Sequence, residues 1–234
     1  MILLLILLLV LAAGLILITL GAFNIQWNFF LKAVHRANTA TRQIALTFDD
    51  GPHPMYTPRV LELLEKHGIR ATFFCIGKHV AQYPYVAMEL QRHGHVVGNH
   101  SFTHAPTIDF HNRAKWVVEI RQTDDAIEQA IGKRPRFFRP PYGVTTPHLA
   151  KAIKQTNHTV IGWKVRPYDT LNRPPEQIVR TILRKTKPGD IILLHDTHER
   201  IVPVLEQLLP ELKKRTFDMV TVEKLTQQHA YTQD

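Results

Sequence analysis

The chain has 234 residues, 44% hydrophobic and 21% charged, a balance typical of a folded globular protein and not of a disordered one. The net charge is +9, but its basic residues are spread along the chain and are not interleaved with aromatic residues. This argues against a nucleic-acid partner and favours solvated surface, with attraction to an anionic envelope as the second interpretation. The single cysteine, Cys75, excludes an internal disulfide and a thiolate zinc site, and its apolar neighbours predict a buried side chain.

The N-terminal segment, residues 1–30, contains no charged side chain, and its first twenty residues are almost wholly Leu, Ile, Val and Ala. A secretory signal has an apolar core of roughly 7–15 residues, whereas spanning a bilayer takes about 20. We therefore predict a transmembrane anchor over 1–30, a linker over 31–42 and one folded domain over 43–234. A cleaved signal and a buried soluble helix are the alternatives.

Short apolar runs alternate with amphipathic patterns through the rest of the chain. The apolar runs predict seven strands buried on both faces: Gln43–Phe48, Ala71–Ile76, His95–Gly98, Phe137–Arg139, Thr159–Val165, Asp190–Leu194 and Met219–Val222. The amphipathic patterns predict helices, several of which begin at a proline: Pro58–His67, Pro84–His93, Lys115–Ile131, Pro147–Gln155, Pro175–Lys185 and Pro203–Arg215. This alternation implies right-handed βαβ units and a parallel sheet.

Polar residues follow several of the predicted strands, and their distribution bears on the architecture. They are Asp49-Asp50, His100, Tyr142, Asp169 and His195. Catalytic groups at the carboxyl ends of many strands are typical of α/β barrels, whereas an open doubly wound sheet gathers its site at one switch point. No G-x-G-x-x-G motif follows the first strand. We therefore predict a barrel.

Two motifs carry groups suited to metal chemistry. The segment 47–52 reads Thr-Phe-Asp-Asp-Gly-Pro, so Asp49 and Asp50 end a strand and point in different directions. One acid can bind a metal while the other accepts a proton from water, although a solvated turn is the structural alternative. His100 and His104 are four residues apart, a spacing that on a helical turn places both imidazoles on one face, where they can hold a zinc-sized ion. The pairs His93/His95 and His195/His198 lack this spacing, and we predict that they are not ligands.

Two further motifs follow strands. Arg139–Gly143 reads Arg-Pro-Pro-Tyr-Gly, a rigid turn that can hold a backbone N–H toward a developing oxyanion, or serve only as a turn. The apolar run Ile191–Leu194 ends at His195, which is either a general acid or a core histidine.

In order and spacing these motifs resemble those of the polysaccharide deacetylases with a NodB homology domain, also called carbohydrate esterase family 4. The resemblance covers nearly everything from Gln43 to Val222 and implies an irregular (β/α)7 barrel, here preceded by one transmembrane helix. It also implies a role for each matching residue. Asp49 matches the catalytic base, Arg139 the arginine that orients it, and Asp50, His100 and His104 the metal ligands. Tyr142 matches the oxyanion-binding backbone N–H, Leu193 a wall of the acetyl-methyl pocket, and His195 the general acid.

One motif departs from the family pattern, which usually has two aspartates three residues apart, followed by tryptophan. Here Arg166 replaces the first aspartate and Thr170 replaces the tryptophan, while the second acid is present as Asp169. We expect Asp169 to pair with His195 and keep it protonated, because a nearby anion raises the pKa of an imidazole. The substitutions leave the catalytic groups in place but change the wall that would pack against a sugar.

The expected function is metal-dependent removal of acetyl groups from N-acetylglucosamine units of a polysaccharide such as peptidoglycan or a chitin-like glycan. Zn²⁺ is the expected metal, with Co²⁺ or Ni²⁺ compatible with the same ligands. The alternatives are short oligosaccharides, O-acetyl esters or a non-sugar amide as substrate, and a glycan-binding module without activity. The resemblance places the domain on the cell-envelope side of the membrane, but Lys32, Arg36 and Arg42 follow the span, and the positive-inside rule would place it in the cytoplasm.

Overall fold

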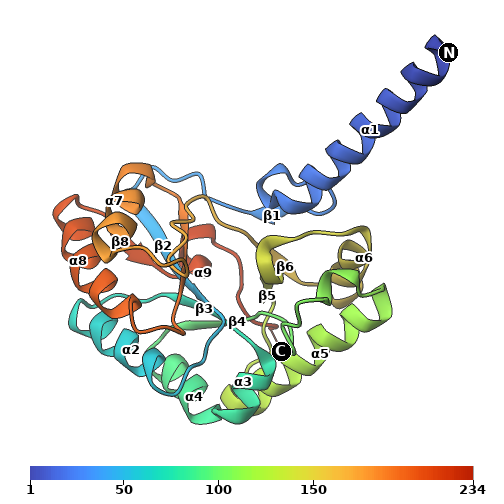
Figure 1. Ribbon diagram of the computed structural model, residues 1–234. Coiled ribbons are helices and arrows are strands. Elements are labelled where there is room, and N and C mark those ends of the chain that lie inside the picture. Colours follow the sequence, from blue (N-terminus) through green and yellow to red (C-terminus); the bar gives the residue numbers. More distant parts are fainter. Residues whose placement is uncertain (234) are drawn as a thin grey trace.

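The computed structural model describes residues 1–233 and has a curved parallel sheet surrounded by helices (Figure 1). The strands are β1 (Ala33–Val34), β2 (Gln43–Asp49), β3 (Thr72–Cys75), β4 (Val96–Asn99), β5 (Phe137–Phe138), β6 (Thr159–Ile161), β7 (Ile191–His195) and β8 (Asp218–Val220). Their order is β1-β6-β5-β4-β3-β2-β7, with β8 also paired to β2, and every pair is parallel.

Except for the short C-terminal helix, the helices lie on the outside of the sheet, as parallel βαβ units require. They are α2 (Tyr56–Lys66), α3 (Gly77–Gln82), α4 (Pro84–Arg92), α5 (Arg113–Ile131), α6 (Pro147–Thr156), α7 (Pro175–Lys185), α8 (Ile201–Lys214) and α9 (Val222–Thr226). The exception is α9, whose Val222 and Leu225 join the same cluster as Ala45 of β2. The six predicted helices are confirmed to within a few residues. The short helices α3 and α9 were not predicted, because neither is long enough to show an amphipathic period.

The predicted irregular barrel is confirmed, although hydrogen-bonded strands alone do not close it. The predicted strand from Thr159 ends at Ile161, and the chain then crosses to β7 on the open side of the sheet, whose edge strands are β1 and β7. There Val165 forms a single parallel bridge with Ile192, and the Leu193 N–H donates to the Val165 carbonyl at 2.9 Å. A second isolated bridge, antiparallel, joins Arg36 to Asp190, so two isolated bridges close the barrel on this side, beside a loop that reaches the mouth.

The side chains of β2 point alternately to the two faces of the sheet, and this alternation places some of them at the mouth of the barrel. Ile44, Leu46 and Phe48 pack in the core between sheet and helices, whereas Ala45 belongs to a separate cluster inside the barrel. Because side chains of a strand alternate between faces, Thr47 and Asp49 share the inner face with Ala45. Asp49, the last residue of the strand, therefore lies at the carboxyl end of the barrel interior.

The N-terminal helix α1 (Ile2–Phe23) projects away from the barrel (Figure 1), and it is long and apolar enough to cross a membrane. Its last turn is nevertheless attached to the domain. Gly21 is buried, and the Thr145 N–H donates to the Ala22 carbonyl at 2.9 Å. Just beyond the helix, Ile25 is 3% exposed and belongs to a core cluster.

The stretch 31–42, expected to be a linker, contributes strand β1, which pairs with β6. Ala33 and Val34 align with Val160 and Ile161. A two-residue strand is too short to show a period-2 pattern, so it could not be predicted from the sequence.

Candidate active site

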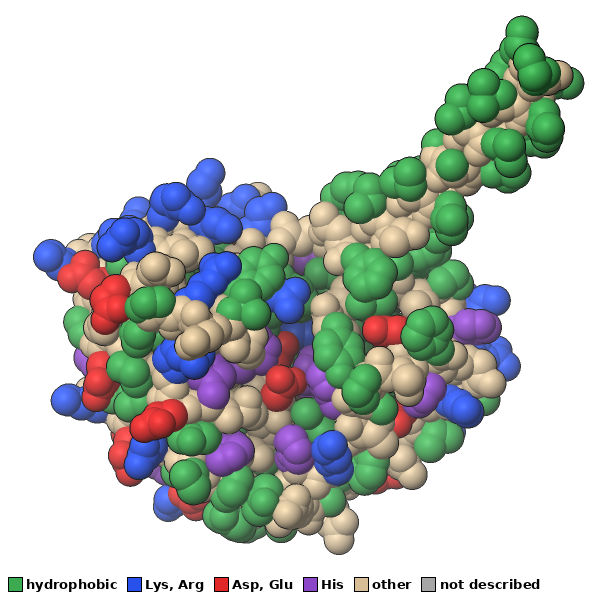
Figure 2. Space-filling model, viewed as in Figure 1, with side chains coloured by type: hydrophobic (Ala, Val, Ile, Leu, Met, Phe, Trp, Pro, Cys, Tyr) green, Lys and Arg blue, Asp and Glu red, His purple; other side chains and the backbone are tan. Residues whose placement is uncertain are grey.

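The carboxyl ends of the strands surround a cavity of about 280 Å³ that gathers most of the predicted site residues. Figure 2 shows histidine and acidic side chains collected near the centre of this face of the molecule. The predicted residues that line the cavity are Asp49, Asp50, His100, His104, Tyr142, Leu193 and His195. A larger depression of about 840 Å³, which includes Arg70 and Asp218, contains none of them.

Asp50, His100 and His104 form the one group of metal-ligand side chains found among residues 1–233, with their ligand atoms within 4.8 Å of one another. The Nε2 atoms of both histidines lie 3.3 Å from Asp50 Oδ1. His100 Nδ1 lies 2.8 Å from the Arg139 carbonyl oxygen, which orients the ring and leaves Nε2 for a ligand bond. Two imidazoles and one carboxylate are a donor set that zinc accepts, so the residues fit a divalent metal.

The charge states of this group also suit a metal site. Burial and the neighbouring His100 lower the pKa of His104 to about 4, so that its ring is neutral at pH 7. Burial alone would raise the pKa of Asp50, but the hydrogen bond and charge of His100 outweigh it and hold that pKa well below its usual range. A neutral imidazole and an ionised carboxylate are the forms that bind metals.

The two histidines meet through a loop and not through the helical turn that the sequence predicted, so that part of the prediction was wrong. Ser101 and His104 have φ angles of 63° and 49°, which interrupt a right-handed helix. Buried Glu119 of α5 holds the loop by accepting hydrogen bonds from the N–H groups of Phe102 and Thr103 at 2.9 and 2.8 Å. The His-x-x-x-His spacing is retained, but a distant acid on α5 sets its geometry.

Asp49 lies beside the triad and is held by a fully buried arginine. Arg139 Nη1 donates to Asp49 Oδ1 and to Thr47 Oγ1, each at 2.7 Å. The same guanidinium donates to the Ile161 and Gly162 carbonyls at 3.0 Å, so its position is fixed both by β2 and by the end of β6. Asp49 Oδ2 is 3.8 Å from His100 Nε2, which places this second carboxylate next to the triad.

The Arg139–Gly143 segment forms the predicted tight turn at another side of the cavity. Tyr142 has a φ of 57°, and its N–H donates to no acceptor among residues 1–233. Its hydroxyl donates to the His104 carbonyl at 3.2 Å, and its ring packs edge-on against the His104 ring at 4.6 Å. Leu193, 2% exposed, contributes an apolar patch to the cavity.

His195 forms the predicted pair with Asp169. Its Nδ1 lies 3.1 Å from Asp169 Oδ1, and its backbone N–H donates to Asp169 Oδ2 at 2.8 Å. Burial would lower the pKa of His195, but the hydrogen bond and charge of Asp169 outweigh it and raise that pKa to about 9. The imidazole is therefore protonated at neutral pH, as the sequence predicted.

Comparison with known proteins identifies the family to which this arrangement belongs. A family model described as polysaccharide deacetylase matches residues 36–161. The chain belongs to the polysaccharide deacetylase family. Over 187 residues it is 37% identical to a peptidoglycan-N-acetylglucosamine deacetylase of Bacillus cereus, covering 78% of this chain and 87% of that protein. It is also 34% identical over 196 residues to a chitooligosaccharide deacetylase of Bradyrhizobium, covering 77% of this chain and 89% of that protein.

Solved structures of other polysaccharide deacetylases share the fold. The crystal structure of the Bc1960 peptidoglycan N-acetylglucosamine deacetylase, bound to a hydroxamate, aligns with a TM-score of 0.80 at 29% identity, covering 85% of this chain and 94% of that one. BA3943 of Bacillus anthracis, described as a pseudoenzyme of the same family, aligns with a TM-score of 0.77 at 27% identity. The alignment covers 83% of this chain and 68% of that one. The family therefore includes members without activity, so the site residues themselves have to carry any argument for catalysis.

The segment in which this polysaccharide deacetylase departs from the family pattern forms one wall of the cavity. Arg166 and Thr170 both line it, together with Trp163. The Arg166 guanidinium lies over the Trp163 ring at 5.4 Å and over the Tyr168 ring at 5.0 Å. The sequence predicted that Arg166 and Thr170 alter this wall, but not that Arg166 stacks on Trp163 and Tyr168.

Several supporting residues had no sequence signal, because their contacts join distant parts of the chain. Thr47 and Glu119 hold Arg139 and the histidine loop, as described above. His198, predicted not to be a ligand, lies 3.5 Å from Asp169 Oδ2 and so shares that carboxylate with His195. Asp196 is fully buried beside the site and accepts a hydrogen bond from the Thr57 hydroxyl, and burial raises its pKa to about 7.

Proposed function

We propose that the chain is a metal-dependent hydrolase that removes acetyl groups from N-acetylglucosamine units of a polysaccharide such as peptidoglycan or a chitin-like glycan. The observation that carries the proposal is the convergence of Asp49, the Asp50–His100–His104 triad and protonated His195 on one cavity. The names of the relatives, which refer to peptidoglycan and chitooligosaccharide, support the substrate class.

In this proposal Asp50, His100 and His104 hold a divalent metal, with Zn²⁺ the first choice and Co²⁺ or Ni²⁺ compatible with the donors. When bound, such an ion polarises a substrate carbonyl and lowers the pKa of coordinated water. His100 is oriented for this role by the Arg139 carbonyl. The ion pair with Arg139 holds Asp49 beside the triad.

Asp49 acts as the general base that takes a proton from the attacking water. The role is supported by its place beside the triad and by Arg139, which fixes the carboxylate through a charge-assisted hydrogen bond. The Tyr142 N–H, free of any acceptor among the described residues, would donate to the oxyanion. Leu193 would receive the acetyl methyl group.

His195 acts as the general acid that protonates the leaving amine. A group in this role must carry a proton at working pH, and Asp169 supplies the charge that keeps it there. The products are acetate and a free glucosamine unit. Asp169 is a positioning residue, because it acts through His195.

A non-catalytic glycan-binding role is the second candidate, and the similarity to the BA3943 pseudoenzyme is the observation that favours it. Against it stands the presence of base, ligands and acid within one cavity. Short oligosaccharides, O-acetyl esters and non-sugar amides are the alternative substrates for the same site. The changed wall at Arg166 and Thr170 is the feature that would admit them.

We further propose that α1 anchors the domain to a membrane. Its length and apolar composition support a span, and the burial of Gly21 and Ile25 supports retention of the segment that follows it. With the domain on the envelope side, the site would face the polysaccharide that the relatives' names describe. Labelling of Asn38→Cys, at an exposed position just after the span, with a membrane-impermeant thiol reagent would report the side, because the native Cys75 is buried.

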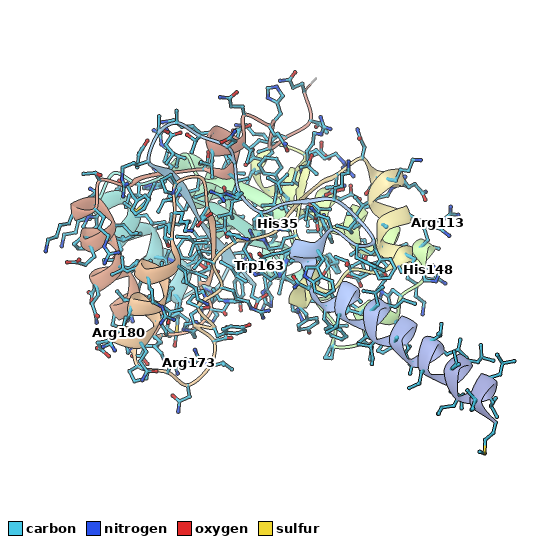
Figure 3. The ribbon with its side chains drawn as sticks, turned by 90° about the horizontal axis from the view of Figure 1, so that it is seen from above. His35, Arg113, His148, Trp163, Arg173 and Arg180 are labelled. Atoms are coloured by element: carbon cyan, nitrogen blue, oxygen red, sulfur yellow. The ribbon has the colours of Figure 1, made fainter. Side chains whose placement is uncertain are left out.

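The test of the activity is acetate release by the full chain in detergent micelles from a defined N-acetylglucosamine polymer, an oligomer and an acetyl ester. Activity should be lost with a chelator and return with Zn²⁺. His100→Ala should lose both turnover and stoichiometric metal, whereas His148→Ala, an exposed histidine distant from the cavity (Figure 3), should lose neither. Undiminished turnover in His100→Ala would contradict the mechanism, and glycan binding without metal or turnover in the unaltered chain would favour the binding module.

A further inference from the structure

The altered wall of the cavity carries positive charge without a carboxylate partner. Arg166 lines the cavity with His195 and Thr170. Across residues 1–233, neither Arg166 nor Arg173 forms an ion pair or donates a side-chain hydrogen bond. The nearest acid in the sequence, Asp169, is fully buried and is shared by His195 and His198. The guanidinium donors at this wall are therefore unused by the protein.

Aromatic rings hold these guanidinium groups in place. Arg166 lies over both Trp163 and Tyr168, and Arg173 lies 5.7 Å from the Tyr168 ring centre. Trp163 is buried and gives the stack a rigid base. A guanidinium held over a ring face keeps the N–H donors at its edge available, and a preformed position reduces the entropy lost on binding.

We propose that Arg166 binds a carboxylate of the substrate and thereby selects an N-acetylated saccharide that carries an acidic group on the deacetylated sugar or on its neighbour. The inference rests on the proposed deacetylase function and adds the substrate class to it. Arg173 contributes to the positive potential beside the same wall. Arg166 is a specificity residue in this account, and the reaction itself uses the groups already described.

A carboxylate fits this wall better than a neutral hydroxyl does. The guanidinium presents N–H donors in a planar fork that matches the two carboxylate oxygens, and such charge-assisted pairs are about twice as strong as neutral hydrogen bonds. Thr170, an exposed and small residue where the family usually has tryptophan, leaves space beside Arg166. The tryptophan of the family pattern would pack against a sugar ring, whereas Arg166 at this wall favours an anionic group.

The test compares three small substrates that differ at the proposed contact. The first is the disaccharide of N-acetylglucosamine and N-acetylmuramic acid with its free carboxylate, the second is the same disaccharide with that carboxylate converted to an amide, and the third is diacetylchitobiose. The readout is kcat and KM for acetate release by the full chain in detergent. The unaltered chain should prefer the free acid to the amide by about tenfold or more in kcat/KM, as expected for hydrogen bonds between charged groups.

Arg166→Ala should lower kcat/KM for the free acid by about ten- to a hundredfold, mainly through KM, and change the two neutral substrates by no more than about twofold. Arg166→Lys keeps the charge without the fork and should recover part of the loss. Arg113→Ala is the matched control, because Arg113 is an exposed arginine at the start of α5, far from Trp163 and Arg173 (Figure 3).

Two results would overturn the inference while leaving the proposed function intact. One is equal turnover of the acid and the amide by the unaltered chain. The other is an equal loss on all three substrates in Arg166→Ala, which would make Arg166 a packing residue for Trp163 and Tyr168. Failure of the unaltered chain to release acetate from any substrate would instead overturn the deacetylase function, and the inference with it.

Discussion

Arg139 offers the sharpest test of how the site is held together. Its side chain is fully buried, and its guanidinium donates four hydrogen bonds: to Asp49, to Thr47 and to the carbonyls of Ile161 and Gly162. Arg139→Met keeps much of the volume but removes every donor. The substitution leaves the Asp49 carboxylate, 3% exposed, without its hydrogen-bonded ion-pair partner.

Removing one partner of a buried ion pair costs about 3–5 kcal/mol, because the remaining charge stays desolvated. In a domain of this size each kcal/mol lowers Tm by about 2–4 °C, so Arg139→Met should lower Tm by roughly 6–20 °C. The assay is thermal unfolding of the full chain in micelles, followed by fluorescence of the buried Trp116 and Trp163. A chelator is present throughout, so that metal binding does not add to the difference.

The control is a double-mutant cycle with Asp49→Asn. If the cost arises from the unpaired charge, Asp49→Asn combined with Arg139→Met should be less destabilised than the sum of the two single variants, by about 1 kcal/mol or more. Additive effects would mean that Arg139 acts only through packing and its carbonyl contacts. A loss below about 1 kcal/mol in Arg139→Met alone would refute the reasoning altogether.

Three further outcomes are expected. Asp169→Asn should lower the pKa of His195 and move the alkaline limb of the kcat/KM profile to lower pH. Because the folded-state pKa of His195 is raised to about 9, the stability that this pair contributes is present below pH 6.5 and is lost as the pH rises through 9. The Tm difference between Asp169→Asn and the unaltered chain should therefore shrink at high pH. His104→Ala should remove stoichiometric Zn²⁺, measured after equilibrium dialysis, with little change in far-UV circular dichroism. Gly21→Val should push a side chain into the Phe29 ring and lower stability by about 1–3 kcal/mol, measured by thermal unfolding, whereas Gly14→Val, in the exposed part of the helix, should not.

The sequence predicted the sheet and the position of the site because both depend on local patterns. Strands buried on both faces appear as apolar runs, and β2 and β7 were placed to within two residues. Once the strands are known to be parallel, the polar residues that follow them must meet at one end. The predicted barrel puts Asp49 and His195 at one mouth for this reason, and in the structure they align across the β2–β7 pair.

The parts that the sequence could not predict depend on contacts between distant residues. The loop that carries His104 takes its shape from Glu119, an acid on α5 that resembles any other helical glutamate in the sequence. Strand β1 forms because Ala33 and Val34 pair with β6, which lies far along the chain. Neither feature has a periodicity or a short motif of its own, so both required the three-dimensional structure.

The two halves of the cavity are held by different kinds of contact, and this bears on how its specificity can differ from that of its relatives. Asp49 and Arg139 lie at strand ends and are fixed by buried hydrogen bonds, so a change there costs stability as well as activity. The loop with Arg166 and Thr170 leads from β6 toward β7. Its buried Asp169 is fixed by His195, whereas Arg166 is held by stacked rings and Thr170 is exposed. Substitutions at Arg166 and Thr170 would therefore alter what the cavity binds without disturbing the buried network, to which Asp169 of the same loop belongs. Under the proposed function, the glycan that is bound can therefore change on a scaffold whose proposed base, acid and metal ligands stay in place.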